Sequence, residues 1–307
     1  MKIGYACINM TLKDQGITTN RGMRKATFES KGLSYVSELA LENVKGLLEI
    51  VQWNVDNNIH AFRMSSSLFP WFSEYEIPTL PDWPQINEIL WQTGQLALQN
   101  DMRISFHPGS FTILCSPKEQ VVRNAIKELN QHAFILDAMG LPCNVTHKVN
   151  IHIGGAYGDK QSAMDRWISN FKLLSESAKN RITIENDDKP NMYDVQDLLY
   201  VSDETGCPIV FDFHHHDCHP GSLSKEDALV AALETWPSGI TPMTHYSSCK
   251  RVYEDSTSKV VAHADYLHEQ IPFTDKYNFD VMVEAKAKEL AVQKYLEDYK
   301  PANYLVC

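Results

Sequence analysis

The fold is decided in residues 182–217, which read ITIENDDKPNMYDVQDLLYVSDETGCPIVFDFHHHD. The stretch opens with an apolar run of strand length, Ile182–Glu185, and closes with a second one, 208–213. Between them, residues 191–204 have the apolar spacing of a helix and stop before Gly206, a residue typical of a helix C-terminus. A strand, a helix and a second strand in this order predict a βαβ unit, in which the two strands are parallel.

The same alternation continues in both directions along the chain, about eight times. The expected strands are 3–8, 61–66, 103–107, 149–153, 182–185, 208–213, 240–245 and 279–284. The expected helices are 33–57, 83–100, 118–139, 161–179, 191–204, 225–235 and 285–299. Parallel strands joined by helices bury both faces of their sheet, so such units close most simply into an α/β (β/α)₈ TIM barrel.

An open, doubly wound sheet is the structural alternative to a barrel. Such a sheet usually carries a Gly-rich turn after its first strand. Here that turn reads INMTLKDQGITTNRG and has no GxGxxG pattern. We therefore expect a single barrel domain over residues 1–307. Two connections, 9–32 and 246–278, are long, and long loops in a compact barrel are commonly functional.

The composition argues against several classes of protein. Lys and Arg number 28 against 39 Asp and Glu, and the net charge of −11 opposes binding of nucleic acid by bulk charge. A hydrophobic fraction of 43% excludes a disordered chain. No apolar run reaches the roughly 18 residues of a membrane span, and the start, MKIGYACINMTLKD, lacks a signal-peptide pattern. Seven cysteines without CxxC spacing indicate a reducing compartment, so we expect a cytoplasmic protein with no membrane contact and no obligate protein partner.

Side chains that bind metals stand at the carboxyl end of nearly every expected strand, where the chemistry of a TIM barrel takes place. A single histidine there is more often a packing residue than a ligand, but a run over six consecutive strand ends is not a chance pattern. Alternation along the strand favours His214 beside the sixth strand's aspartate, yet we assign His215 because the strand is expected to end there. The candidate ligands are His107, His152, Glu185, Asp212, His215, His245, His263 and Glu284.

This set of five imidazoles and three carboxylates predicts a metal cluster. Imidazole with carboxylate suits zinc, manganese or iron(II) better than calcium or magnesium alone. Eight ligands exceed the need of one ion, so we expect two or three. Such clusters stabilise the attacking and leaving oxygens of a phosphoryl displacement. We assign Glu185 and Glu284 as central ligands, able to bridge ions, and count them with His245 as catalytic.

In this order the motifs resemble those of the UV damage endonucleases. The likeness runs from residue 3 to about 288, and its most specific pieces are HIGGAYGDK, ENDD and MVEAK. The motifs that carry it are Gly4-Tyr5, Asn9, TTNR at 18–21, FRMSS at 62–66, FHPG at 106–109, HIGGAYG at 152–158, END at 185–187, Asp212 with His215-His216, His245 and VEAK at 283–286.

The resemblance implies a TIM barrel related to the endonuclease IV-type apurinic endonucleases. It implies up to three divalent ions, usually manganese, with magnesium, zinc or cobalt as other possibilities, and the family's ligands fall on the eight strand-end residues above. It also implies incision of double-stranded DNA immediately 5′ of cyclobutane pyrimidine dimers and 6-4 photoproducts, leaving 3′-hydroxyl and 5′-phosphate ends. Such incision starts an alternative excision repair, in which the enzyme acts at the nucleoid.

Two positions depart from the family pattern. Some members carry a carboxylated lysine two residues before the position of His245, and here a thioether, Met243, stands there. The family's damage-probing pair after HPG is often Gln-Tyr, and here it is Ser110-Phe111. Phe111 keeps an aromatic wedge that can stack on a base, whereas Ser110 lacks the reach of a glutamine. The lesion preference therefore becomes a question for this chain.

The expected DNA contacts lie in the loops that follow the strands, where phosphates would lie. Residues 18–31 carry a local charge of +3 in an otherwise acidic chain, and the acidic residues gather on helices. The whole chain is therefore negative, whereas this loop at the proposed DNA-facing end is positive. The candidate contact residues are Tyr5, Asn9, Asn20, Arg21, Arg63, Ser110, Phe111, Tyr157 and Lys250.

Three other functions share part of this pattern. An apurinic-site endonuclease has the same metal chemistry, and duplexes carrying an abasic site or a thymine dimer would separate the two. A metal-dependent sugar isomerase or epimerase also places Glu, Asp and His at the strand ends of this barrel, although five histidines exceed the usual sugar site. A damage-binding or metal-storing protein without catalysis would not need the complete set of ligands.

Overall fold

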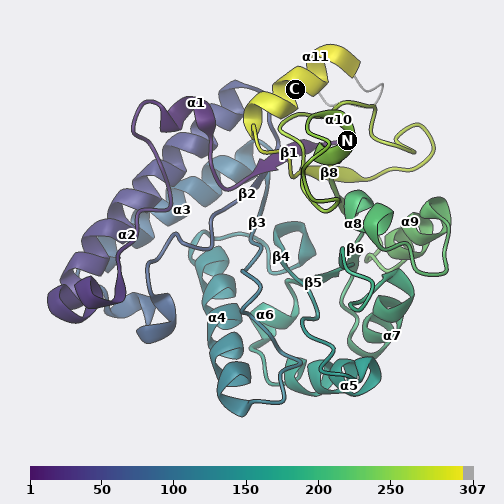
Figure 1. Cartoon of the computed structure of the whole chain (residues 1–307). Coiled ribbons are helices and arrows are strands. Elements are labelled where there is room, and N and C mark those ends of the chain that lie inside the picture. The colour runs from purple at the N-terminus through teal and green to yellow at the C-terminus, as the bar shows by residue number, and fades with distance from the viewer. Residues whose placement is uncertain (300–307) are drawn as a thin grey trace.

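The structure, a computed structural model, describes residues 1–299, and a barrel of short parallel strands lies at its centre (Figure 1). Each strand falls within one of the eight predicted segments or extends it by a single residue. The strands are β1 (Ile3–Ala6), β2 (Ala61–Arg63), β3 (Arg103–Ser105), β4 (Val149–Ile151), β5 (Ile182–Glu185), β6 (Ile209–Val210), β7 (Met243–Tyr246) and β8 (Asp280–Val283).

The strands pair in the order of a closed barrel. Five of them form a sheet in the order β3-β2-β1-β8-β7, and three form a second sheet in the order β4-β5-β6. Single parallel bridges join the two sheets, Phe106 to Val149 at one seam and Asp212 to His245 at the other. Every strand thus has two neighbours, which excludes the open doubly wound sheet and confirms the predicted (β/α)₈ barrel.

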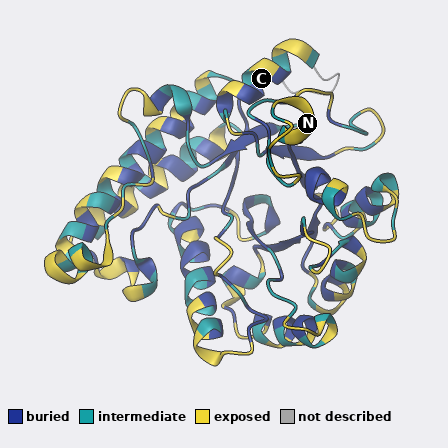
Figure 2. Ribbon diagram, in the orientation of Figure 1, coloured by how far each residue is buried: buried dark blue, intermediate teal, exposed yellow. Residues whose placement is uncertain are grey.

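Helices surround the barrel with their buried faces toward the strands and their exposed faces outward (Figure 2). In the part of the chain that the structure describes, no helix is long and apolar enough to cross a membrane. The helices are α1 (Met10–Lys13), α2 (Lys25–Asp56), α3 (Trp83–Gln99), α4 (Glu119–Ala138), α5 (Lys160–Phe171), α6 (Glu176–Lys179), α7 (Val195–Thr205), α8 (Phe213–Cys218), α9 (Lys225–Glu234), α10 (Lys250–Tyr253) and α11 (Glu289–Tyr299), with 3₁₀ turns η1 (Phe72–Glu74), η2 (Ile77–Thr79) and η3 (Val145–His147).

Side-chain caps decide where two of the expected helices begin. The helix expected from residue 191 starts at Val195, because Asp194 and Asp197 form a reciprocal capping box. The single helix expected over 161–179 is two helices, and Ser175 caps the second. The predicted helix end at Gly206 is confirmed, since this glycine has a φ of 74° in the left-handed region.

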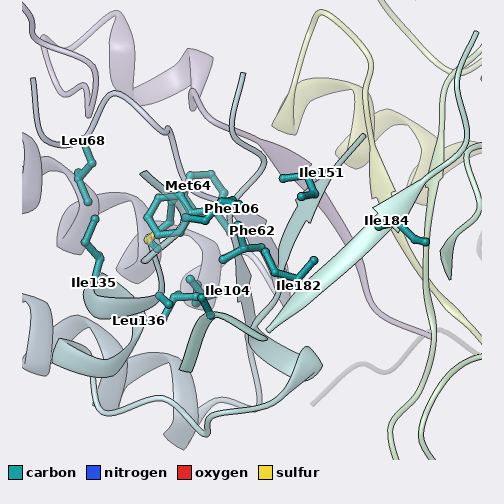
Figure 3. Close-up of a cluster of buried hydrophobic side chains, with 14 of the residues drawn as sticks. Phe62, Met64, Leu68, Ile104, Phe106, Ile135, Leu136, Ile151, Ile182 and Ile184 are labelled. Atoms are coloured by element: carbon teal, nitrogen blue, oxygen red, sulfur yellow. The ribbon is translucent and has the colours of Figure 1, made fainter. Parts of the chain in front are cut away.

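The apolar core fixes the strand ends that carry the predicted ligands. Figure 3 shows Ile104 of β3 and Ile182 of β5 among buried side chains that include Ile135 and Leu136 of α4. Burying an aliphatic side chain of this size contributes roughly 1.5–3 kcal/mol. Packing of α4 against this side of the barrel therefore helps to hold β3 and β5 in place.

Gly94 of α3 leaves no room for a side chain, because a Cβ there would overlap the carbonyl oxygen of Met139 at the end of α4. We expect Gly94→Ala to lower the free energy of unfolding by about 2 kcal/mol, despite the better helix propensity of alanine. Urea denaturation measures this. The control Gly22→Ala, where the nearest atom is 4.0 Å away, should change it by less than about 0.5 kcal/mol. Equal stability of the two variants would contradict the close helix contact.

Candidate metal centre

Six of the eight predicted ligands lie side by side at the carboxyl end of the barrel. They form two groups, and within each group one ligand atom per residue lies within 4.8 Å of the others. Glu185, at the end of β5, belongs to both groups, which makes it the centre of the cluster. The first group is His107, Glu185, His245 and Glu284, and the second is His152, Glu185 and His215.

The Glu185 carboxylate has no exposed surface and is surrounded by imidazoles. Its Oε2 lies 3.0 Å from His107 Nε2, and its Oε1 lies 3.2 Å from His245 Nδ1 and 3.3 Å from His215 Nδ1. The Asn150 side-chain amide, from the strand next to β5, donates a hydrogen bond to Oε2 and fixes the orientation of the carboxylate. Histidines from several strand ends therefore meet at one acid.

Several buried polar atoms at this place have no hydrogen-bond partner among the described residues. They are Glu185 Oε1, Asp212 Oδ2 and His245 Nδ1. Leaving a buried acceptor without a donor costs about 1–3 kcal/mol, so native proteins rarely do so without a reason. Glu185 Oε1 and His245 Nδ1 belong to one ligand group, so a divalent cation there would satisfy both, and a set of imidazole and carboxylate donors suits such an ion. The residues present therefore fit a metal centre.

The other two predicted ligands lie next to the two groups, outside them. Asp212 caps α8 by accepting the backbone N–H of His215, and its Oδ2 lies 4.0 Å from His215 Nδ1. The His263 ring centroid lies 6.1 Å from that of His215, and Ser247 Oγ lies 2.7 Å from His263 Nδ1. Helix α8 turns His215 toward Glu185, and the assignment of His215 in preference to His214 stays a prediction.

The electrostatics around Glu185 favour an ionised carboxylate beside a neutral His107 imidazole. Burial would raise the pKa of Glu185, but His245, His152 and His107 outweigh this and hold the pKa well below its usual range. Burial lowers the pKa of His107 to about 4, so this imidazole is neutral at pH 7. A neutral imidazole beside an ionised carboxylate is the state that a metal ion requires of its ligands.

Two histidines of the cluster hold protons instead. Burial lowers the pKa of His152, yet Glu185 and Asp187 raise it to about 9. Burial also opposes the charge of His215, while Asp212 and Glu185 raise its pKa to about 11. These protons compensate the buried carboxylates, and a bound divalent ion would displace them. The affinity of the site for a metal is therefore expected to fall as the pH is lowered.

The structure adds side chains to the centre that no strand-end rule selects. Asp187 Oδ1 lies 3.2 Å from His152 Nδ1 and can orient that ring. Asn186 pairs with the backbone of Asp212 in both directions, through bonds of 2.8 and 3.0 Å. The ENDD motif at 185–188 contains both residues, but only the first residue of that motif ends a strand.

A lysine reaches the centre from an unexpected strand. Met243, at the position where some family members carry a carboxylated lysine, is buried and provides no amine. Lys148, directly before β4, is also buried, and its Nζ lies 3.4 Å from His245 Nε2. Burial lowers the pKa of Lys148 to about 7. No sequence pattern indicated this contact, because a lysine before a short strand is usually exposed.

A family model described as UV-endonuclease UvdE matches residues 1–305 of this chain. The match spans the barrel and all of the strand ends that carry the cluster. The chain belongs to the UvdE family.

Two curated relatives bear the family's activity in their names. The UV-damage endonuclease of Schizosaccharomyces pombe (strain 972) is 36% identical over 312 residues, which cover 98% of this chain and 51% of that protein. The UV DNA damage endonuclease of Bacillus cereus (strain Q1) is 33% identical over 313 residues, which cover 97% of this chain and 94% of that protein. The chain thus spans about half of the first relative and nearly all of the second. The predicted family and enzyme class, an endonuclease acting on DNA, are confirmed.

Solved structures give the same fold. SacUVDE has 32% sequence identity and a TM-score of 0.85, with 99% of this chain and all of that chain covered. Endonuclease IV from Thermus thermophilus has a TM-score of 0.56 at 12% identity, with 83% of this chain and 93% of that chain covered. At such low identity the second match shows the fold alone. Both support the TIM barrel predicted for this UvdE-family chain.

Four of the residues expected to contact DNA in this UvdE-family chain are exposed. They lie in loops that follow the strands. Phe111 has 89% of its surface exposed and Tyr157 has 50%. Ser110 and Tyr157 line a cleft of about 450 Å³ whose wall includes His152, which makes the cleft a path to the cluster. Asn20, in the loop after β1, is exposed as well.

Two other expected contacts, Tyr5 and Asn9, are fully buried. The Tyr5 hydroxyl donates to Asn54 Oδ1 at 2.7 Å and accepts a bond of 2.9 Å from the Asn9 side-chain amide. Both residues therefore support the loop after β1, and neither has a surface for DNA. The sequence motif alone could not separate a supporting aromatic at the end of a strand from an exposed one.

Three basic side chains expected on DNA have partners within the protein. The Arg63 guanidinium forms a salt bridge with the carboxylate of Glu284, a predicted ligand. The Arg21 guanidinium donates to backbone carbonyls of its own loop. Lys250 Nζ lies 3.0 Å from a carboxylate oxygen of Asp265. These cations thus orient loops and a ligand, and their charge is already partly compensated.

A substitution of Asp187 tests the metal centre without changing any of the predicted ligands. Asp187→Asn removes the charge beside His152 Nδ1, so we expect metal affinity to fall about 10- to 100-fold while the fold persists. Isothermal titration with Mn²⁺ and circular dichroism measure the two effects. The matched control is Asp188→Asn, a neighbour without an ion pair among the described residues, which should bind Mn²⁺ like the parent. Equal affinities of the two variants would contradict the orienting role.

Proposed function

We propose that this chain cuts double-stranded DNA immediately 5′ of UV photoproducts, both cyclobutane pyrimidine dimers and 6-4 photoproducts. The cut leaves 3′-hydroxyl and 5′-phosphate ends and starts an excision repair. The cofactor is a cluster of two or three divalent ions, manganese first among them, and the enzyme works in the cytoplasm at the nucleoid. One observation carries the proposal: the two ligand groups share Glu185 beside a cleft that His152 and the exposed ring of Tyr157 line.

The chain's own residues prepare the reaction by fixing the ligand cluster. Asn150 holds the Glu185 carboxylate, and Arg63 holds the Glu284 carboxylate in the same way. Divalent ions held by these carboxylates and histidines would supply a nucleophile at neutral pH and would offset the charge of the leaving oxygen. Because the supporting bonds are formed before substrate arrives, little reorganisation is left for the reaction step.

Lesion recognition falls to the exposed aromatic side chains beside the cleft. Phe111 and Tyr157 line a second recess of about 390 Å³ with Ile113, and Tyr157 also lines the cleft that leads to the ligands. The Arg166 guanidinium lies 5.7 Å from the Tyr157 ring centroid and steadies that ring. A photoproduct weakens stacking and pairing, so bases leave the helix there at the least cost and can stack on Phe111.

The shared carboxylate gives the direct test of the proposed activity. Glu185→Gln keeps the size of the side chain but loses the charge that both ligand groups use, so nicking of UV-irradiated plasmid should fall more than about 100-fold. The assay follows conversion of supercoiled to nicked plasmid with Mn²⁺, with circular dichroism as the folding check. Glu119→Gln, at an exposed position of α4, serves as the control and should nick normally. Full activity of Glu185→Gln would refute the assignment.

The same assay conditions separate the proposed activity from its nearest rival. The parent protein is given duplexes that carry a thymine dimer or an abasic site. Cutting at the dimer supports the proposal, whereas cutting only at the abasic site identifies an apurinic endonuclease.

Phe111 offers a test of lesion recognition that leaves the core untouched. Stacking on an aromatic side chain contributes about 1–3 kcal/mol per base, so Phe111→Ala should lower kcat/KM on a thymine-dimer duplex about tenfold. Phe111→Tyr should retain the parent value because it keeps the ring. Leu173→Ala changes another exposed apolar side chain, 63% exposed in the connection from α5 to α6, and should have no effect. Parent-like activity of Phe111→Ala would exclude a stacking role.

A further inference from the structure

Two lysines just after β8 have no acidic partner. Lys286 is exposed and Lys288 is half-buried, and within residues 1–299 neither side chain forms an ion pair or a hydrogen bond. Other lysines of the same part of the chain are paired, for example Lys276 with Glu226 at 3.0 Å and Lys294 with Asp298 at 2.9 Å. The charge of the two lysines after β8 is therefore uncompensated within the described chain.

The carboxylates closest to this turn are all engaged elsewhere. Glu284 binds Arg63, and Asp265 binds Lys250. The two oxygens of Glu289 accept the backbone N–H groups at the start of α1, at 2.7 and 2.8 Å. None of these acids forms an ion pair with the two lysines, so both ammonium groups can bind a negative group from outside the chain.

Backbone bonds tie the turn that carries the two lysines to the residues after His263. The N–H groups of Lys286 and Ala287 donate to the carbonyls of Ala264 and Asp265, which directly follow His263. The turn that carries the lysines is thus held between two predicted ligands, Glu284 before it and His263 across from it.

The electrostatics of this turn indicate crowding of positive charge. Burial lowers the pKa of Lys288, Arg63 and Lys286 lower it further, and the Cys7 thiol and the Glu284 carboxylate oppose them. A half-buried ammonium group beside other cations favours the binding of an anion. A negative group there would compensate both the cost of burial and the repulsion between the cations.

We propose that Lys286 and Lys288 bind a backbone phosphate of the DNA strand next to the phosphodiester that is cut, and so fix which bond lies over the ligand cluster. This inference rests on the proposed function. Successive phosphates of one strand lie about 3.4 Å apart along the helix axis. A strand with one phosphate at Glu284 therefore brings a neighbouring phosphate to the turn that follows this residue. The lysines are positioning residues, since they act through the strand and not on the reacting atoms.

The test compares the parent with the double variant Lys286→Met/Lys288→Met in single-turnover nicking of a thymine-dimer duplex. We expect the half-saturating enzyme concentration to rise about tenfold, and the plateau rate to stay within about twofold. The slope of log affinity against log salt should become shallower by about 1. Mapping the cut on a sequencing gel should show incision at neighbouring phosphodiesters as well, a readout that loss of stability alone would not produce.

Two further variants complete the design. The control Lys276→Met/Lys294→Met removes the same number of cations from paired positions and should bind and cut like the parent. Lys286→Arg/Lys288→Arg keeps both charges and should retain the parent salt slope, which makes the test independent of whether the methionine variant folds. An unchanged affinity and salt slope in a folded methionine variant, or an equal loss in the control, would overturn the proposal.

Substitution in the DNA localises the contact. Replacing single phosphates by neutral methylphosphonates should weaken binding to the parent at one position beside the cut, and that position should have no effect on the methionine variant. If no position distinguishes the two proteins, the phosphate contact is refuted. If the parent fails to nick irradiated DNA at all, the proposed function fails instead, and the two failures are thereby distinguished.

Discussion

The buried carboxylate of Glu185 is the constraint on which the rest of the site depends. It has no exposed surface, and removing such a charge from water costs several kcal/mol unless it is compensated. The compensation comes from histidines that belong to different strand ends, among them His107 after β3 and His245 on β7. Because the chain after β6 pairs with β7 through a single bridge, Asp212 to His245, closure of the barrel and assembly of the cluster take place at the same seam. Closure of the barrel therefore also brings the predicted ligands together.

The sequence predicted the barrel and most of the ligands because both are properties of strand ends. An apolar run that stops at His152 or Glu185 shows the strand and its terminal ligand together. The sequence could not reveal the contact between Lys148 and His245, because these residues lie far apart in the chain. Helix starts were displaced for a related reason: a cap such as Asp194 acts through hydrogen bonds that the apolar spacing does not contain.

The net charge of −11 says little about the face that meets DNA, because a basic side chain that is paired within the protein is less available to a phosphate. Arg63, expected on a phosphate, serves a ligand carboxylate, and Arg21 fastens its own loop. By contrast, Lys286 ends the VEAK motif and Lys288 lies two residues beyond it, and neither lysine forms an ion pair within the described chain. Specific positive sites beside a metal cluster allow an acidic protein to hold a polyanion.

The most direct test of the central role of Glu185 is anomalous diffraction from crystals grown with Mn²⁺, recorded at the manganese edge. The account predicts at least two anomalous peaks, with Glu185 coordinating in both ligand groups, one with His107, His245 and Glu284 and the other with His152 and His215. Peaks that lie elsewhere on the protein, or a single ion that leaves Glu185 uncoordinated, would contradict it.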